Sequence, residues 1–176
     1  MGELAFLVVA AALLGSLGFP AFLPYNWHKF LHVVGVVLFV GNIVVTGAWM
    51  FLSERTMDSA VLRFSSRVVN WADVAFTAPG VILILLNGLI LANQWGGIFG
   101  ASWITAGGTL LVVSGLVWVG FLIRYQDIMI RLSEGSQGGQ LPSEFFSVLH
   151  KWYFWGMIAT ILPLITVALM VVKPVL

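Results

Sequence analysis

Long apolar stretches dominate this sequence. A helix that crosses a bilayer needs roughly 20 mostly apolar residues. Five stretches meet this requirement, at residues 4–23, 27–52, 73–91, 103–123 and 146–172. Runs of this length exclude membrane β-strands, which alternate polar and apolar residues over about 10 positions. The sequence therefore predicts an all-α fold, a polytopic integral membrane helical bundle that residues 1–176 form as a single transmembrane domain.

Composition excludes several classes of function. Only 9% of the residues are charged and 60% are hydrophobic, whereas a soluble domain has about 25% charged residues. The net charge of +1 gives no basic field for a nucleic acid. Cysteine is absent, which excludes disulfides, cysteine-ligated iron–sulfur clusters and covalently attached haem. A bound metal must therefore be held by His, Met, carboxylate or backbone groups.

The first apolar stretch resembles a signal peptide in length but lacks the positive charge that a signal peptide has at its start. The early charge is Glu3. We therefore expect five transmembrane helices, a four-helix core plus an N-terminal helix. Four crossings are the alternative, because Gly15, Gly18 and Pro20 interrupt this stretch.

The loop charges predict the orientation of the chain. Five arginines lie in the two long loops, and the short loops at residues 19–26 and 93–102 contain no Lys or Arg. Because Lys and Arg are retained on the cytoplasmic side, we expect a cytoplasmic N-terminus and a periplasmic C-terminus in a bacterial inner membrane. Within the long loops, residues 53–70 have the pattern of an amphipathic interfacial helix, and residues 133–143 that of a flexible Gly/Ser/Gln-rich connector.

Polar residues follow one face of two predicted helices. In the stretch 27–52 this face carries His28, His32, Gly35, Phe39, Asn42, Thr46 and Trp49, and in the stretch 73–91 it carries Asp73, Thr77, Gly80, Ile84 and Asn87. Polar groups at membrane depth are costly and are candidate functional groups. We expect Asn42 and Asn87 to face each other. The alternative is that these amides only hydrogen-bond between helices while the glycines allow close packing.

The histidines are the candidate ligands. A neutral His32 is suited to coordinate haem iron, with Gly35 and Gly41 leaving room for the macrocycle. The alternatives are a proton relay and a hydrogen-bonded histidine of the bundle. His150 is expected in the opposite leaflet, roughly 15–20 Å away, so one iron cannot bind both. The second ligand would be His28 or Met170, unless there are two cofactors.

A cluster of charged residues is predicted at the cytoplasmic ends of the helices. Its members are Arg67, Asp73, Arg124, Asp127, His150 and Lys151. We expect ion pairs there, either as solvated interfacial charges or as a site for an acidic group such as a haem propionate or a lipid phosphate.

Several short motifs resemble known membrane families. The segment 25–35 contains Trp-x-Lys-x-x-His and, with the Lys-Pro ending at residues 173–174, is similar to HemJ-type protoporphyrinogen oxidases. The resemblance is closer to the membrane family called domain of unknown function 2269, through Lys-x-x-His-x-x-Gly, Gly41-Asn42, Ala78-Pro79-Gly80, Asn87-Gly88 and Gln126. It covers about residues 25 to 174. The Arg-rich helix end, the later Lys and the Asn-Glu-x-Pro of HemJ-type proteins are missing here.

By analogy, the resemblance implies haem b bound through His32, with His28, Lys29, Gly35, Asn42 and His150 as further cofactor-binding residues. The function expected is electron transfer or haem and porphyrin metabolism, with quinone or porphyrin as partner. If the protein is an enzyme, it is a membrane oxidoreductase. A non-catalytic subunit of a larger complex, or of a homo-oligomer, is the first alternative. The second is copper handling, against which the methionines are scattered in the sequence.

Overall fold

The computed structural model describes residues 20–136 and 139–175, and this part of the chain is helical throughout except for short connections. Its elements are α2 (Tyr25–Thr56), α3 (Ser59–Ala72), η1 (Asp73–Thr77), α4 (Ala78–Ala92), η2 (Asn93–Trp95), α5 (Ser102–Val117), η3 (Trp118–Leu122), α6 (Ile123–Gly135) and α7 (Ser143–Val172). Four continuous helices result, and each is long and apolar enough to cross a membrane. The all-α prediction is confirmed for the described residues. Most of the predicted fifth helix, residues 4–23, lies outside them.

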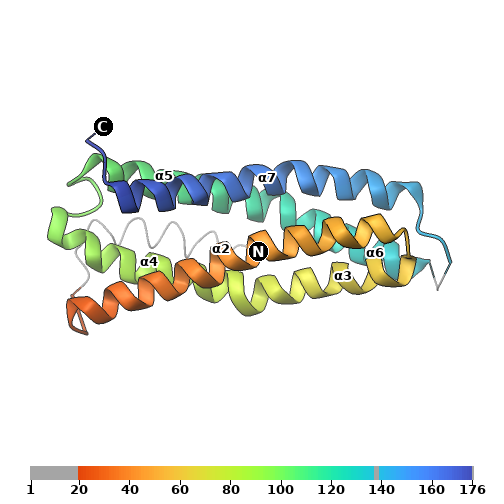
Figure 1. Ribbon diagram of the computed structural model, residues 1–176, viewed down its shortest axis with the longest axis horizontal. Coiled ribbons are helices and arrows are strands. Elements are labelled where there is room, and N and C mark those ends of the chain that lie inside the picture. The colour runs from red at the N-terminus through yellow and green to blue at the C-terminus, as the bar shows by residue number, and fades with distance from the viewer. Residues whose placement is uncertain (1–19, 137–138, 176) are drawn as a thin grey trace.

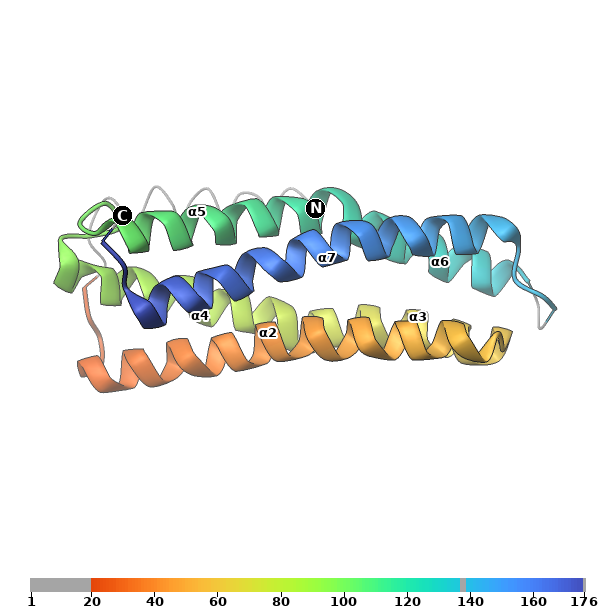
Figure 2. The ribbon, with the colours of Figure 1, turned by 45° about the horizontal axis from the view of Figure 1, so that its top comes forward.

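The four helices form two consecutive antiparallel hairpins. Helix α2 packs along α3, η1 and α4, and helix α7 packs along α5, η3 and α6 (Figure 1). Figure 2 shows the two hairpins as two layers. One end of the bundle, here called the His28 end, holds the start of α2, the α4–α5 connection and the C-terminus. The other, the Glu54 end, holds the α2–α3 turn and the α6–α7 connection.

Local sequence explains where the helices begin and end. Helix α2 follows Pro24 and ends at Met57, which has a left-handed φ of 52° and donates its N–H to the Glu54 carbonyl. The carboxylate of Asp58 then accepts from the N–H groups of Ala60 and Val61 at 2.7 and 3.4 Å. A side-chain cap of this kind satisfies the free N–H groups of a first turn. The tight turn between α2 and α3 is therefore fixed by one αL residue and one acidic cap.

Residues 53–70 differ from the prediction. They were expected as an interfacial helix, separate from the apolar span that follows. Instead α3 continues through η1 into α4, so that Ser59–Trp95 is one helix of 37 residues. Its polar residues pair with the second hairpin: Arg63 donates from Nε to the Ser133 carbonyl at 2.8 Å, and Arg67 pairs with Glu134 at 2.7 Å. Pairing with α6 allows a polar helix segment to extend the span. The expected connector 133–143 is shortened, because α6 runs to Gly135.

Proline is accommodated inside α7 by a hydroxyl group from α5. Pro163 has no N–H to donate to the carbonyl of Ala159, four residues earlier. The Ser114 hydroxyl, which is buried, donates to this carbonyl at 2.8 Å. The carbonyl that Pro163 leaves without a donor is thus satisfied by a hydrogen bond between α5 and α7.

Replacing Ser114 with Ala should lower the free energy of unfolding by about 1–2 kcal/mol, because the Ala159 carbonyl then has no donor. Thermal unfolding in detergent, followed by circular dichroism, measures this change. The matched control is Ser147→Ala, which removes an exposed hydroxyl from the same hairpin and should change stability by less than about 0.5 kcal/mol. Equal effects of the two substitutions would contradict a role of Ser114 in satisfying the proline site.

Candidate functional site

The carboxyl group of Asp73 is the centre of a buried polar network between the two hairpins. Its Oδ1 atom accepts from Asn42 Nδ2 at 3.0 Å and from Thr77 Oγ1 at 2.9 Å. Its Oδ2 atom accepts from Gln126 Nε2 at 2.8 Å and from Trp118 Nε1 at 3.3 Å. Asp73 is 7% exposed. The four donors come from α2, η1, α6 and η3, so this one group connects the first hairpin to the second.

The donors around Asp73 match the acceptor capacity of a carboxylate. An ionised carboxyl group accepts about four hydrogen bonds and donates none. Here each of the two oxygens accepts from two neutral donors. No ion pair to Asp73 occurs among the described residues. The Asn42 amide also donates to Thr77 Oγ1 at 2.8 Å, which agrees with Thr77 donating onward to Asp73. A carboxylate at this position is therefore stabilised by dipoles, with no cation paired to it among the described residues.

Both helices that flank this network contain a π-helical turn at the network itself. Asp73 begins η1 and Trp118 begins η3, and these two residues are hydrogen-bonded to each other. Pro79 follows η1 and cannot donate to the carbonyl of Ala75, which lies in η1. Isolated π-turns inside α-helices occur frequently at functional sites. The two turns meet at Asp73.

The prediction that Asn42 faces Asn87 is wrong. Fourteen residues separate His28 from Asn42, and fourteen separate Asp73 from Asn87. In the antiparallel register of α2 and α4, Asn42 therefore lies opposite Asp73, and Asn87 lies opposite His28. The predicted ion-pair cluster is also wrong in its membership, because Asp73 is buried away from the charged residues. The described ion pairs are Arg67–Glu134, Arg131–Asp127 and His150–Glu54.

His28 is fully buried, and both of its ring nitrogens are used. Its Nδ1 lies 2.8 Å from Asn87 Oδ1, and its Nε2 accepts from the backbone N–H of Leu23 at 3.2 Å. Phe22 packs edge-on against the ring. Because an amide oxygen is an acceptor, Nδ1 carries the proton and the ring is neutral. This geometry anchors the chain before α2 to α4 and leaves no lone pair for a metal.

His32 is placed differently. Its Nδ1 is 3.0 Å from the Ile84 carbonyl, so Nδ1 carries the proton and Nε2 keeps its lone pair. The ring lies against Gly88, where a Cβ atom would be 3.0 Å from Cε1. Metal-bound histidines commonly donate their second N–H to a backbone carbonyl, which fixes the ring. His32 therefore has the hydrogen bonding of a ligand inside the bundle, whereas His150, whose Nε2 faces Glu54 Oε1 at 3.0 Å, has a comparable pattern at an exposed position.

The remaining predicted site residues do not gather around His32. The space expected beside Gly35 is filled by α4, because a Cβ atom at this position would lie 2.8 Å from the Gly80 carbonyl oxygen. Beside Gly41, in contrast, a Cβ atom would meet nothing within 4 Å. Lys29 is exposed at the His28 end. His150 is at the Glu54 end, where its Nε2 lies 3.0 Å from Glu54 Oε1.

The expected second ligands of an iron are also engaged elsewhere. Met170 packs against Gly107, where a Cβ atom would lie 2.6 Å from the methionine methyl group. His28 is excluded by its two hydrogen bonds. Within the described residues, no three His, Asp or Glu side chains are grouped as they would be to hold a metal ion. Within the described residues, His32 thus offers a single imidazole nitrogen as a ligand, and no second ligand for an iron and no multi-ligand copper site is grouped with it.

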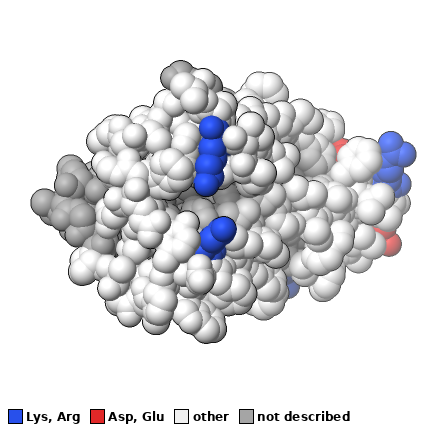
Figure 3. Space-filling view, turned by 60° about the vertical axis from the view of Figure 1, so that its left-hand side comes forward, with Lys and Arg blue, Asp and Glu red and all other residues white. Residues whose placement is uncertain are grey.

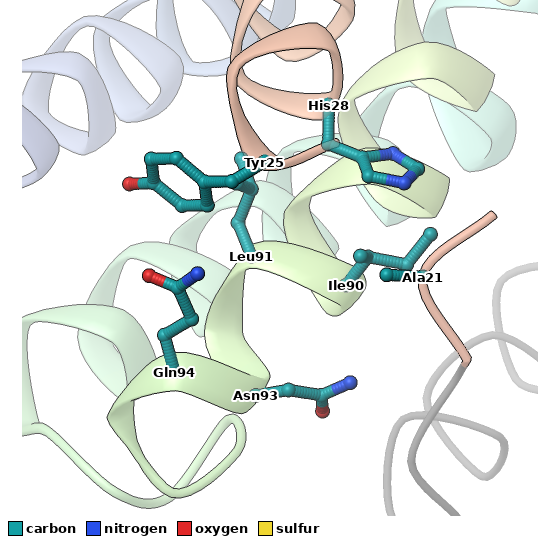
Figure 4. A pocket seen from close by; sticks show the side chains of 7 residues that line it. All are labelled: Ala21, Tyr25, His28, Ile90, Leu91, Asn93 and Gln94. Carbon is teal, nitrogen blue, oxygen red and sulfur yellow. The ribbon is translucent and has the colours of Figure 1, made fainter. Parts of the chain in front are cut away.

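A hollow of about 300 Å³ lies at the His28 end. Figure 4 shows the side chains that line this hollow. They come from the start of α2, from Ala21 in the chain before α2, and from the end of α4 with η2. They are Ala21, Tyr25, His28, Ile90, Leu91, Asn93 and Gln94. His32 is not among them. Figure 3 shows this end of the molecule as mainly uncharged, with basic and no acidic side chains at its centre.

The sequence alone did not reveal the partners of Asp73. The residues missed were Trp118, and Gln126, noted only as a motif residue. A partial signal was present, since Gln126 is an uncharged polar residue eight positions after Trp118, within the width of one broad helix face. Gly88 was likewise noted in a motif, without its contact to the His32 ring.

Comparison with known proteins assigns the chain to a family. No curated protein and no solved structure matches it. The family described as "Predicted integral membrane protein (DUF2269)" matches residues 27–174, which include all four long helices except the first two residues of α2. The match covers well over half of the chain and agrees with its four apolar helices. The chain therefore belongs to this family of integral membrane proteins.

Proposed function

We propose that this protein binds haem b through Nε2 of His32 and acts in electron transfer or in haem and porphyrin metabolism. The observation that carries the proposal is the hydrogen bond from His32 Nδ1 to the Ile84 carbonyl. This bond leaves a lone pair on Nε2 and fixes the plane of the ring, as second-sphere carbonyl groups do for metal-bound histidines. Bound haem would supply one-electron chemistry at its iron.

The chain's own residues orient this ligand. The Ile84 carbonyl holds the tautomer, and the absence of a side chain at Gly88 lets the ring lie flat against α4. Lys29 lies one turn before His32, at the exposed end of α2, where it can pair with an acidic group of the ligand. His32 would be the residue that holds the haem, and a quinone or a porphyrin would be its partner in the reaction.

The orientation and compartment form part of the same proposal. Counting Lys and Arg places the Glu54 end in the cytoplasm and the His28 end, with the C-terminus, in the periplasm of a bacterial inner membrane. His32 then lies in the outer leaflet. A cysteine-accessibility assay with single cysteines at Ser136 and at Phe99, which is exposed, tests this, because the sequence has no cysteine. Labelling from the cytoplasmic side only at Ser136 is the expected result.

The haem proposal is tested by absorption spectra of oxidised and dithionite-reduced protein, with a pyridine haemochrome assay. We expect about one haem per chain, and a decrease of more than about tenfold in His32→Ala, because even second-sphere changes cost 10–100-fold in affinity. His150→Ala is the matched control, since this histidine is exposed and distant, and it should retain haem. Circular dichroism checks that both variants are folded.

A colourless wild-type protein from cells supplied with haem would overturn the haem proposal. The function favoured in that case is a non-catalytic subunit of a larger membrane complex. One observation favours this second candidate: two of the three histidines, His28 and His150, have ordinary hydrogen-bonded partners. Co-purification of the same membrane partner in stoichiometric amount would support it.

A further inference from the structure

Asp73 combines three features that the haem proposal does not use. It is an ionisable residue inside an apolar helix bundle, its charge has no cationic partner among the described residues, and it lies where two π-turns meet. Ionisable residues at such positions are rare, and they mark proton or ion pathways. We propose that Asp73 is a proton-binding site that exchanges protons with the Glu54 end of the bundle, and that the amides of Gln126 and Asn70 adjust their hydrogen bonds to its charge state.

The proposal rests on how the amides connect Asp73 to its surroundings. Gln126 donates from Nε2 to Asp73 Oδ2 at 2.8 Å, and its Oε1 accepts from Asn70 Nδ2 at 3.4 Å. Gln126 is buried, whereas Asn70 is half-buried and lies on α3, toward the Glu54 end. The two amides therefore form a chain from a partly accessible position to the buried carboxyl group.

The two amides can hydrogen-bond to Asp73 in both of its charge states. An amide has two donors on one side and an acceptor on the other. With the carboxylate, Gln126 presents Nε2 to Asp73, as observed. When a proton from water binds at Oδ2, a rotation of the Gln126 amide by half a turn presents Oε1 to the new O–H group. Its Nε2 then faces Asn70, whose own rotation supplies an acceptor. The contacts of Gln126 with Asp73 and Asn70 are kept with donor and acceptor exchanged, and Asn42 and Thr77 still donate to Oδ1.

The other elements packed around Asp73 bring no competing charge. Its contacts are Asn42 from α2, Thr77 from η1, Trp118 from η3 and Gln126 from α6, and none of these changes charge in the ordinary pH range. On α6, the charged residues Arg124 and Asp127 are exposed, and Asp127 pairs with Arg131. The occupancy of the site is therefore governed by the proton and not by a neighbouring ion.

The indole N–H of Trp118 is a built-in reporter, because it donates to the oxygen that takes up the proton. The test is a pH titration of the full chain in lipid nanodiscs, with ¹⁵N-labelled tryptophan. The signal is assigned with Trp118→Phe. We expect the Trp118 indole resonance to move with pH in the wild type and to be constant in Asp73→Asn. Asn is the isosteric neutral analogue, and its amide can donate to a rotated Gln126.

Infrared spectra supply the second readout. The wild type minus Asp73→Asn difference should contain a protonated-carboxyl band that disappears as the pH is raised. Glu54→Gln is the matched control, because Glu54 is a carboxyl group on the same bundle that pairs with His150. It should leave the Trp118 titration unchanged.

A Trp118 resonance in the wild type that does not move from acid to alkaline pH would overturn the proposal, and Asp73 would then be a fixed structural carboxylate. This result needs only the wild type and Trp118→Phe, so it stands even if Asp73→Asn fails to fold. Neither readout requires haem. The proton site and the haem site can therefore fail independently.

Discussion

Gly35→Ala is expected to lower the free energy of unfolding by about 2 kcal/mol, and Gly80→Ala by a similar amount. A Cβ atom at Gly35 would lie 2.8 Å from the Gly80 carbonyl oxygen, and one at Gly80 would lie 2.9 Å from the Gly35 oxygen. Backbone atoms cannot rotate away as a flexible side chain can, so the helices must separate. Overpacking of this kind typically costs about 1–3 kcal/mol.

The contact between Gly35 and Gly80 lies midway between two sets of hydrogen bonds that join α2 to the helix 59–95. Gly35 lies seven residues from both His28 and Asn42, and Gly80 lies seven residues from both Asp73 and Asn87. Separation of α2 from α4 at this midpoint therefore lengthens the hydrogen bonds on both sides of it. Helix–helix association in membranes depends on such small-residue contacts, because burial from water does not drive it.

Gly41→Ala and Gly47→Ala are the matched controls, because a Cβ atom at either position meets nothing within 4 Å. Alanine should stabilise the helix there by up to about 1 kcal/mol, through its higher helix propensity. Unfolding in mixed micelles, followed by circular dichroism, compares the four variants. Similar stabilities of all four would contradict the close approach of α2 and α4.

His28→Leu is expected to lower the free energy of unfolding by about 2–3 kcal/mol. The substitution leaves the buried Asn87 Oδ1 and the part-buried Leu23 N–H without their partners, and an unsatisfied buried group costs about 1–3 kcal/mol. Asn87→Leu should cost about 1–2 kcal/mol for the same reason. The double variant should be more stable than the sum of the two effects predicts, by about 1 kcal/mol.

The double-mutant cycle distinguishes a structural from a ligating role of His28. His150→Leu is the control, since the His150 imidazole is exposed where it meets Glu54, and it should change stability by less than about 0.5 kcal/mol. If the protein binds haem, the haem content per folded chain should be the same in the His28 variants as in the wild type, although their free energy of unfolding is lower. Strict additivity of His28→Leu and Asn87→Leu would mean that the observed hydrogen bond contributes no coupling.

Hydropathy was enough to predict four of the helices, because a bilayer demands long apolar runs whatever the helices pack against. It failed at residues 59–72, where Arg63 and Arg67 lower the hydropathy although the helix continues. Their charge is accommodated by α6, at the Ser133 carbonyl and Glu134. A contact between distant parts of the chain decides this, and no local pattern contains it.

The sequence singled out several residues of the candidate site, but neither their pairings nor the roles of Trp118 and Gln126. His32, Asn42 and Asp73 were all selected because polar groups are rare at membrane depth. The register between α2 and α4 then decided that Asn42 meets Asp73 and not Asn87. That register depends on the approach of Gly35 to Gly80 and on the tight α2–α3 turn. The π-turns were equally hidden, because they depend on a shift of backbone hydrogen bonds that any of several residues would tolerate.

The division of the bundle into two consecutive hairpins has a consequence for its biogenesis. Residues 25–95 and 102–172 each complete their main packing within themselves, so contacts are mostly local in sequence, which favours rapid folding. The first half can assemble while the second is still being synthesised, and the glycine-rich connection at residues 96–101 joins two separable units. Until α6 has been synthesised with Gln126, Asp73 has only the donors of the first hairpin, Asn42 and Thr77. Completion of that carboxyl site therefore requires residues of the second hairpin to dock on the first.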